Sequence, residues 1–385
     1  MKRKMIVFSA IYGLLFIGTN MVHAITPAFF QNMGYPSAMF GIAFACMSLS
    51  NFLISPFWGE RAGEIGYAKC FAFGAMGYTA GQIWFGLSHT PLLSALARLI
   101  TGLFVSSFSI SGVLYVSELG EKDNGGKYVA YLTAVQTACS AAGYFLGGML
   151  GTISFSAAFA GQAILCIMAA MLALVLVHEP RQHKKTASKQ KLNPLLALWN
   201  VRGLLNAYIL TFFAAAMCAS FTTNCFDNAF NYYIRDQFAF PTSYNGIIKA
   251  SVGLLGLVVN LFFNPWLAQK GNLRNAIIVV FSAGTVALML LPLSQSITAF
   301  IVLAVVYYTI SAAYLPIHQT LGAENGGTVY GAYMSVRSFG QMIGGLLAGL
   351  FYALNEQLPF YASAIAFLLA VVFSVVNARQ NAALH

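Results

Sequence analysis

Residues 34–42 read Gly34-Tyr35-Pro36-Ser37-Ala38-Met39-Phe40-Gly41-Ile42, and the pattern returns as Ala239-Phe240-Pro241-Thr242-Ser243-Tyr244-Asn245-Gly246-Ile247. The separation is 205 positions. A repeat that holds its register over a long distance predicts two structurally similar halves. The same separation pairs Gly66 with Gly271 and Lys69 with Arg274, and a separation of 202 pairs Gly120 with Gly322, Tyr128 with Tyr330 and Gly147 with Gly349.

The composition identifies the solvent in which these halves fold. Of 385 residues, 59% are hydrophobic and 8% are charged, whereas soluble domains carry about 25% charged residues. A bilayer-spanning helix needs roughly 20 mostly apolar residues, and the apolar runs are continuous, which excludes a transmembrane β-barrel. The twelve expected spans are 5–27, 39–58, 68–88, 91–117, 127–150, 156–178, 204–233, 243–267, 275–294, 296–319, 328–354 and 357–378.

The expected fold class is therefore an all-α membrane protein with twelve transmembrane helices in two pseudosymmetric six-helix bundles. The bundles are expected at residues 1–178 and 204–385, joined by a cytoplasmic linker at 179–203. This composition excludes an aqueous enzyme and a nucleic-acid-binding protein. Two parallel six-helix repeats around a site at the membrane midplane are the architecture of an alternating-access carrier.

The net charge of +10 is a topology signal. With the N-terminus inside, 16 of the 20 lysines and arginines fall on the cytoplasmic side, while the outer loops hold only Arg235. This positive-inside bias and the even number of spans predict that both termini are cytoplasmic. Short loops without an N-x-S/T sequon favour a multi-pass protein of the bacterial cytoplasmic (inner) membrane. The six cysteines lie within or at the ends of apolar spans without CxxC spacing, so no metal site is expected.

The loop after the second span reads Gly59-Glu60-Arg61-Ala62-Gly63-Glu64-Ile65-Gly66-Tyr67-Ala68-Lys69. It resembles the helix 2–3 signature of the major facilitator superfamily, with glycine and alanine at matching positions. The resemblance implies a gate that holds the cytoplasmic ends of the halves together, with Gly59, Gly66 and the basic Lys69 as parts of it. Gly63 stands where the family has aspartate, so the gating charge would pass to Glu64 or be lost. A tight loop that only carries orientation charges is the alternative.

Two further motifs are similar to those of the drug:proton antiporter-like branch of this superfamily. Arg98-Leu99-Ile100-Thr101-Gly102 resembles R-x-x-x-G, which implies that Arg98 takes part in proton coupling or organises the cavity. An arginine that bonds backbone carbonyls near the outer interface is the alternative.

The second motif is Gly143-Tyr144-Phe145-Leu146-Gly147-Gly148, which resembles the antiporter signature G-P-x-x-G-G with Tyr144 in place of proline. Gly340-Gln341-Met342-Ile343-Gly344-Gly345 echoes it in the second half. Small residues four positions apart let helices approach closely, as a sliding seam requires. Ordinary close packing explains these glycines equally well.

Polar and charged residues within spans normally face a cavity or a partner. In the seventh span, Asn224, Asp227, Asn228 and Asn231 have the spacing i, i+3, i+4, i+7 and share one helical face. The repeat places Asn20 and His23 of the first span close to equivalent positions. Two such faces predict a central site for substrate and proton, whereas a polar stripe between packed helices is the alternative.

The charge of Asp227 depends on whether it has a partner. Lys249 lies at a similar depth on the eighth span, so the two side chains could pair. Without such a pair, Asp227 is the natural proton site of the membrane interior. His23 is the other candidate, because the charge of histidine changes near neutral pH.

The sequence therefore predicts a secondary transporter that moves a small-molecule substrate by alternating access, with proton-coupled export as the leading hypothesis. No Walker-type phosphate loop is present, so a proton gradient is expected to drive transport. The alternatives are an organic-anion symporter or exchanger that binds its anion with Lys249 and Arg337, and a lipid flippase. We expect no enzymatic activity, no cofactor, no nucleic-acid partner and a monomer in the bilayer.

Overall fold

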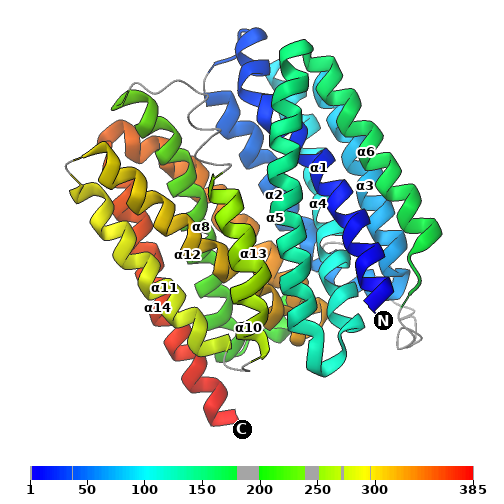
Figure 1. Cartoon of the computed structure of the whole chain (residues 1–385), viewed down its shortest axis with the longest axis vertical. Helices are drawn as coiled ribbons and strands as arrows, with labels where there is room; N and C mark the ends of the chain where they lie inside the picture. The colour runs from blue at the N-terminus through cyan, green and yellow to red at the C-terminus, as the bar shows by residue number, and fades with distance from the viewer. Residues whose placement is uncertain are drawn as a thin grey trace.

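The computed structural model describes residues 2–36, 38–179, 199–238, 251–269, 273–294 and 296–384. These residues are almost entirely helical, and Figure 1 shows the helices gathered in two bundles. The first bundle consists of α1 (Lys2–Asn32), α2 (Ala38–Ile65), α3 (Tyr67–Leu87), α4 (Pro91–Leu119), α5 (Glu121–Ile153) and α6 (Phe155–Leu176).

The second bundle follows a short 3₁₀ turn, η2 (Val201–Leu204). Its first helix is α8 (Ala207–Asp236), followed by the helical segment 251–269, which contains the π-helical turn η3 (Val259–Phe263) and α10 (Asn264–Gln269). The remaining helices are α11 (Leu273–Leu290) with the short η4 (Leu291–Leu293), α12 (Ile297–Glu324), α13 (Gly327–Leu354) and α14 (Leu358–Leu384).

Polar residues at the loop ends fix where several helices begin. The side chain of Thr90 accepts a hydrogen bond from the backbone N–H of Leu93, and Ser154, Asn206 and Ser296 cap α6, α8 and α12 in the same way. Such caps satisfy backbone donors that the helix itself leaves without a partner. Gly66 and Gly326 lie directly before α3 and α13 with φ of 105° and 90°, which a side chain rarely tolerates.

The packing within the two bundles follows the same plan. In the first bundle, α1 packs against α5 and α6, and α3 packs against α4 and α6. In the second bundle, α8 packs against α13 and α14, and α11 packs against α12 and α14. Across the interface α2 packs against α13, while α5 packs against η3, α10 and α12. The expected two pseudosymmetric bundles are therefore confirmed.

The described part of the chain contains nine helices that are long and apolar enough to cross a membrane. The other three expected spans correspond to α3, α13 and the segment 251–269. The large apolar side chains on the outside of the bundles, such as Phe145 and Ile153, are exposed as a lipid-facing surface requires.

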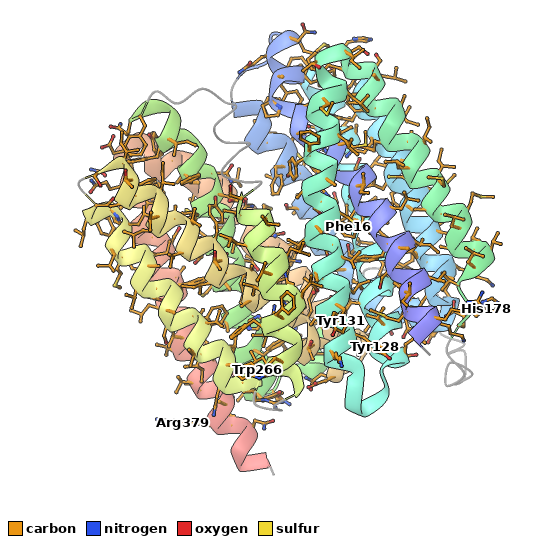
Figure 2. The ribbon with its side chains drawn as sticks, viewed as in Figure 1. Phe16, Tyr128, Tyr131, His178, Trp266 and Arg379 are labelled. Atoms are coloured by element: carbon orange, nitrogen blue, oxygen red, sulfur yellow. The ribbon has the colours of Figure 1, made fainter. Side chains whose placement is uncertain are left out.

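Both chain termini lie at one end of the molecule, at the bottom of Figure 1. In Figure 2 the labelled residues His178, Trp266 and Arg379 lie toward this same end. We refer to it as the terminal end and to the opposite side as the far end.

Candidate functional site

A cavity of about 440 Å³ lies between the two bundles. Its size falls in the range of sites for small organic ligands. Six helical segments contribute to its wall: α2, α5, α8, residues 252–260, α12 and α13. The aromatic, amide and charged side chains that line it are Phe44, Tyr144, Asn224, Asp227, Asn228, Asn260, Tyr308, Tyr314, Arg337 and Gln341.

The predicted polar face of α8 points into this cavity. Asn224, Asp227 and Asn228 line it together with Thr223. Asn224 Nδ2 donates to the backbone oxygen of Gln341 at 2.5 Å, and Asn228 Nδ2 donates to Asn224 Oδ1 at 3.0 Å. The Asn224 amide therefore ties α8 to α13, the Asn228 amide is held by Asn224 within α8, and Asp227 is the charged group of this face. Asn231 belongs to α8, but its side chain lies outside the described residues.

Asp227 has a partner that sequence reasoning missed. The hydroxyl of Tyr308 on α12 donates to Asp227 Oδ1 at 2.6 Å. Tyr308 shares the cavity wall with Ser311, Ala312 and Leu315. These four positions have the spacing i, i+3, i+4, i+7, so the same face pattern that identified α8 could have identified this side of α12.

Arg337 lies on α13 and lines the same cavity among aromatic hydroxyls. It is close enough to Tyr314, Tyr330 and Tyr333 to interact with them electrostatically. Its Nε atom is buried and has no hydrogen-bond partner in the part of the chain that the structure describes. Within the described ranges no carboxylate lies within 4.0 Å of its guanidinium group. The cavity therefore combines one carboxylate and one guanidinium that are not paired with each other.

Arg98 lies outside the central cavity. This side chain is 3% exposed, its Nη2 donates to Thr26 Oγ1 at 3.0 Å, and its guanidinium lies 3.9 Å from the centre of the Phe85 ring. Its Nε and Nη1 atoms have no hydrogen-bond partner among the described residues. Arg98 is thus buried among α1, α3 and α4 and does not line the central cavity.

The polar residues of α1 also stay outside the cavity wall. Asn20 Nδ2 donates to Ser140 Oγ of α5 at 3.0 Å and to the Phe16 backbone oxygen at 2.8 Å. His23 is close enough to Arg98 to interact with it electrostatically. The predicted site therefore divides into a cavity group of Asn224, Asp227, Asn228 and Arg337 and a separate group of Asn20, His23 and Arg98. Lys249 lies outside the described residues.

The π-helical turn η3 contributes a residue that the sequence did not single out. Asn260 is 1% exposed and lines the cavity, and its Nδ2 atom lies 3.3 Å from Thr137 Oγ1 of α5. Asn264 Nδ2 in turn donates to Asn260 Oδ1 at 2.7 Å. A π turn inside an α-helix often occurs at a functional site, and here it joins the second bundle to the first.

The terminal end of the interface is closed by α2 and α13. A Cβ atom on Gly59 would fall on backbone atoms of Gly327 and Gly331, so the two helices touch through their backbones. Nearer the middle of the membrane, Asn51 Nδ2 donates to Ser338 Oγ at 2.8 Å, and Ser335 Oγ donates to the Phe52 backbone oxygen at 2.5 Å. At the cavity wall, Thr133 Oγ1 of α5 donates to Gln319 Oε1 of α12 at 2.9 Å.

The loop between α2 and α3 is held by local contacts. Arg61 forms an ion pair with Glu64 within α2. The backbone N–H of Ala68 donates to Glu179 Oε1 at 2.9 Å, which ties this loop to the end of α6. Gly66 makes the turn between the helices, and Lys69 is exposed.

The glycine motifs occupy the seams inside each bundle. Gly143 and Gly147 of α5 pack on the backbone of α1 at Ile17 and Met21. In the second bundle, Gly340 and Gly344 of α13 pack on the backbone of α8 at Met217 and Phe221, while Gly345 lies beside Asn224. Gly148 differs, because a Cβ atom there would meet no other described residue within 4 Å.

Comparisons with known proteins agree with this architecture. The family model described as Major Facilitator Superfamily matches residues 8–345. The chain is 22% identical over 376 residues to the quinolone resistance protein NorA of Staphylococcus aureus, covering 96% of this chain and 95% of that protein. It is 20% identical to multidrug resistance protein 1 of Bacillus subtilis, covering 94% and 93%.

Among solved structures, the human organic anion transporter MFSD10 (TETRAN) superposes with a TM-score of 0.79 at 16% identity, covering 97% of this chain and 99% of that one. A bacterial homologue of the iron transporter ferroportin in an outward-facing state gives 0.79 at 14% identity, covering 98% and 99%. The transporter FucP in its outward conformation superposes with a TM-score of 0.76 at 14% identity, covering 97% of this chain and 98% of that one. At these identities the likeness shows the fold alone.

Proposed function

The chain belongs to the major facilitator superfamily, and we propose that it exports a small organic solute from the cell in exchange for protons. Membership in this family makes the protein a membrane transporter rather than an enzyme. The direction of transport rests on the curated relatives, whose names describe quinolone resistance and multidrug resistance. Export is the activity that such names imply, and the low identity leaves the substrate to be found by experiment.

The observation that carries the proposal is a ligand-sized cavity between the bundles with a carboxylate in its wall. Asp227 lines this cavity and accepts a hydrogen bond from Tyr308. A carboxylate inside a membrane has a high free-energy cost, and in transporters it normally acts as a proton relay or an ion site. A proton that binds Asp227 when solute leaves, and departs when solute binds, would couple the two movements.

The closed end of the interface supports alternating access. The contacts of Gly59 with Gly327 and Gly331 seal the terminal end, below the cavity. If both termini are cytoplasmic, as the positive-inside bias indicates, this seal is the inner gate and the cavity serves the outer side. In this arrangement the bundles would rock about the midplane site, and the gate between α2 and α13 would open in the inward-facing state.

The test compares Asp227→Asn with wild-type protein in proteoliposomes, using a compound first identified by a thermal-shift screen of organic anions and lipophilic drugs. Asp227→Asn should retain solute exchange and lose accumulation driven by a pH gradient, because an amide cannot bind and release a proton as a carboxylate does. Thr223→Val is the matched control on the same helix and cavity wall, since the Thr223 hydroxyl already donates to its own backbone at Ser220. Accumulation that persists in Asp227→Asn would move the proton site to His23.

A second function is favoured by Arg337. Its guanidinium group lines the cavity with no carboxylate within 4.0 Å in the described ranges. A buried charge without a counter-ion is strongly unfavourable, and an anionic substrate would supply the missing charge. An organic-anion carrier that uses Arg337, with Lys249 as the second cation, is therefore the alternative to cation or neutral-drug export.

A further inference from the structure

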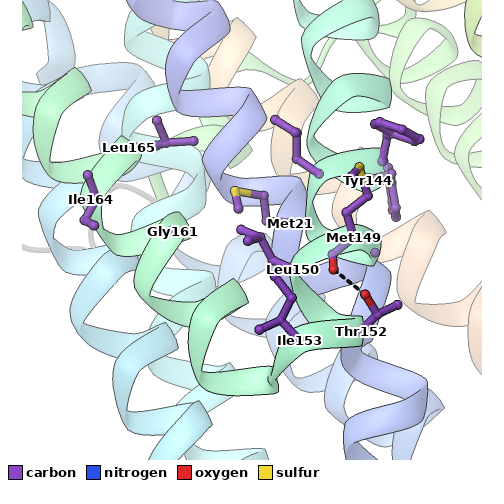
Figure 3. Close-up of a pocket in the computed structure, with 12 residues that line it drawn as sticks. Met21, Tyr144, Met149, Leu150, Thr152, Ile153, Gly161, Ile164 and Leu165 are labelled. Atoms are coloured by element: carbon purple, nitrogen blue, oxygen red, sulfur yellow. Dashed lines mark hydrogen bonds between the residues drawn. The ribbon is translucent and has the colours of Figure 1, made fainter.

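A second hollow lies on the outside of the first bundle. It has a volume of about 830 Å³ and lies against α1, α5 and α6. Figure 3 shows Tyr144 at one edge of this groove and Ile164 and Leu165 of α6 at the other. Its lining is apolar apart from Tyr144 and Thr152, and Thr152 Oγ1 donates to the Met149 backbone oxygen at 2.7 Å. The groove therefore presents a hydrocarbon-binding surface.

The groove faces the lipid near the far end of the membrane. Among its lining side chains, Phe145 is 68% exposed, Ile153 is 76% exposed and Ile164 is 64% exposed. Large apolar side chains with this exposure are expected on a surface that the acyl chains of a membrane cover. The turn between α5 and α6 at Ser154 ends the groove at the far end, opposite the chain termini (Figure 1).

Tyr144 joins the groove to the central cavity. Among the described residues it is the one that belongs to both linings. It stands in the glycine motif of α5 where the antiporter signature has proline. Gly143 and Gly147 in the same motif pack on the backbone of α1, which fixes the path of α5 at this point. Tyr144 therefore lies where the lining of the groove meets the lining of the central cavity.

The lipid around the groove limits what can bind there specifically. An acyl chain gains no hydrophobic free energy by moving from the bilayer into an apolar groove, because lipid tails are as apolar as the side chains. A tail is held in preference to bulk lipid only if another part of the same molecule binds elsewhere on the protein. The central cavity, with its polar wall, lies directly beyond Tyr144.

We propose that the substrate is a single-chain amphiphile whose head group binds in the central cavity while its hydrocarbon tail passes Tyr144 and lies in the groove. The groove is then the route by which the tail exchanges with the leaflet on the far side. This inference rests on the transport function proposed above and adds the substrate class. It also gives Tyr144 a role as a portal residue.

Three glycines allow a matched test. Within the described part of the chain, a Cβ atom at Gly148, Gly41 or Gly349 would meet nothing within 4 Å, so a larger side chain meets no clash there at its first atom. Gly148 lines the groove, Gly41 lines the central cavity, and Gly349 lines neither. Phenylalanine at position 148 therefore fills the groove, phenylalanine at position 41 fills the central cavity, and phenylalanine at position 349 fills neither.

The experiment uses the full chain in nanodiscs with two probes, hexadecyltrimethylammonium and hexadecyl phosphate, each carrying a diazirine at the end of the chain. After irradiation, mass spectrometry quantifies labelling of the peptide that spans residues 144–165. With at least one probe, Gly148→Phe and Gly41→Phe should each lower labelling by about tenfold, which corresponds to about 1.4 kcal/mol. Gly349→Phe should leave labelling unchanged.

The response to Gly41→Phe is the decisive result, because Gly41 lines the central cavity and is not part of the groove lining. If the groove peptide is not labelled, or if its labelling is indifferent to Gly41→Phe with both probes, the groove holds only bulk lipid and the proposal is wrong. Equal loss in Gly349→Phe would mean general disruption and would also overturn it. Loss of pH-driven accumulation in Asp227→Asn is measured separately, so the transport function can stand when this inference fails.

Discussion

Gly59 of α2 and Gly331 of α13 meet backbone against backbone at the terminal end of the bundle interface. A Cβ atom on Gly331 would lie 2.7 Å from the Cα atom of Gly59 and 2.7 Å from the backbone oxygen of Ser55. No side chain fits between the helices at this point. This backbone contact between the halves therefore depends on two glycines that are 272 positions apart in the sequence.

Substitution of Gly331 by alanine should open this end. Overpacking of a tight contact costs about 1–3 kcal/mol, and this cost falls on the closed state alone, so the equilibrium should shift about 5–150-fold toward the state with the terminal end open. Spin labels at the exposed positions Ile65 and Asn325 would report the change as a longer distance. Gly41→Ala on the same α2 is the control, because its Cβ atom would meet no atom of the described residues within 4 Å. An unchanged distance distribution in Gly331→Ala would show that this contact does not set the gate.

The hydrogen bond between Asn51 and Ser338 should contribute to the same equilibrium. Asn51 Nδ2 donates to Ser338 Oγ at 2.8 Å across the interface. Such a bond contributes about 0.5–1.5 kcal/mol net. A double-mutant cycle with Asn51→Ala and Ser338→Ala, read as the population of the closed state, should give a coupling of this size. A coupling near zero would mean that the bond forms equally in both states.

Arg337→Ala should abolish stabilisation by an anionic ligand if the organic-anion alternative is correct. A ligand at 100 times its dissociation constant adds about 2.7 kcal/mol of apparent stability, which a thermal-shift assay detects. Arg337→Lys is the control, since it keeps the charge but loses the planar donor geometry of guanidinium, and it should weaken rather than abolish the effect. Equal anion-induced shifts in wild type and Arg337→Ala would exclude the role of Arg337 as an anion site.

Arg98→Met should leave the thermal stability unchanged or raise it. The guanidinium group is buried, and two of its nitrogen atoms lack hydrogen-bond partners among the described residues. An apolar side chain of similar length removes the desolvation penalty of this charge. If the buried charge serves coupling, the variant should fold normally and lose pH-driven accumulation. A large loss of stability would instead assign Arg98 a structural role through Thr26 and Phe85.

Asp227 and Lys249 should behave as a coupled pair if they contact each other. Neutralising one member of a buried pair leaves the other charge uncompensated, so each of Asp227→Asn and Lys249→Gln should be more harmful than the double variant. Expression level and melting temperature of the three proteins would measure this. Additive losses would show that the two residues act independently.

The sequence identified the twelve spans because the signal for them is local. Length and apolarity within about 20 residues define a membrane helix, and the repeat between residues 34–42 and 239–247 revealed the two halves. The polar face of α8 was also predictable, since helical periodicity alone brings Asn224, Asp227 and Asn228 to one side. Gly59 was found through its motif, although the motif did not reveal that its partner is Gly331.

The tertiary structure decided which of these residues share a site. Arg98 and Arg337 look alike in the sequence, as single arginines inside apolar spans, yet the first packs on Phe85 away from the cavity and the second lines it. Tyr308 is the partner of Asp227 because α12 packs beside α8, and the sequence does not indicate this packing. The sequence had no means of finding the groove beside Tyr144, because three separate helices form it.

Gly147 and Gly148 show why the sequence does not predict what a residue contacts in the folded protein. They are neighbours in one motif, but a helix with 3.6 residues per turn points them in directions about 100° apart. Gly147 therefore packs on the backbone of Met21, while Gly148 opens into the groove. Sequence determines which residues belong to a span and which of them share a helical face. What each face meets is set by the packing of other helices, and that information exists only in the folded molecule.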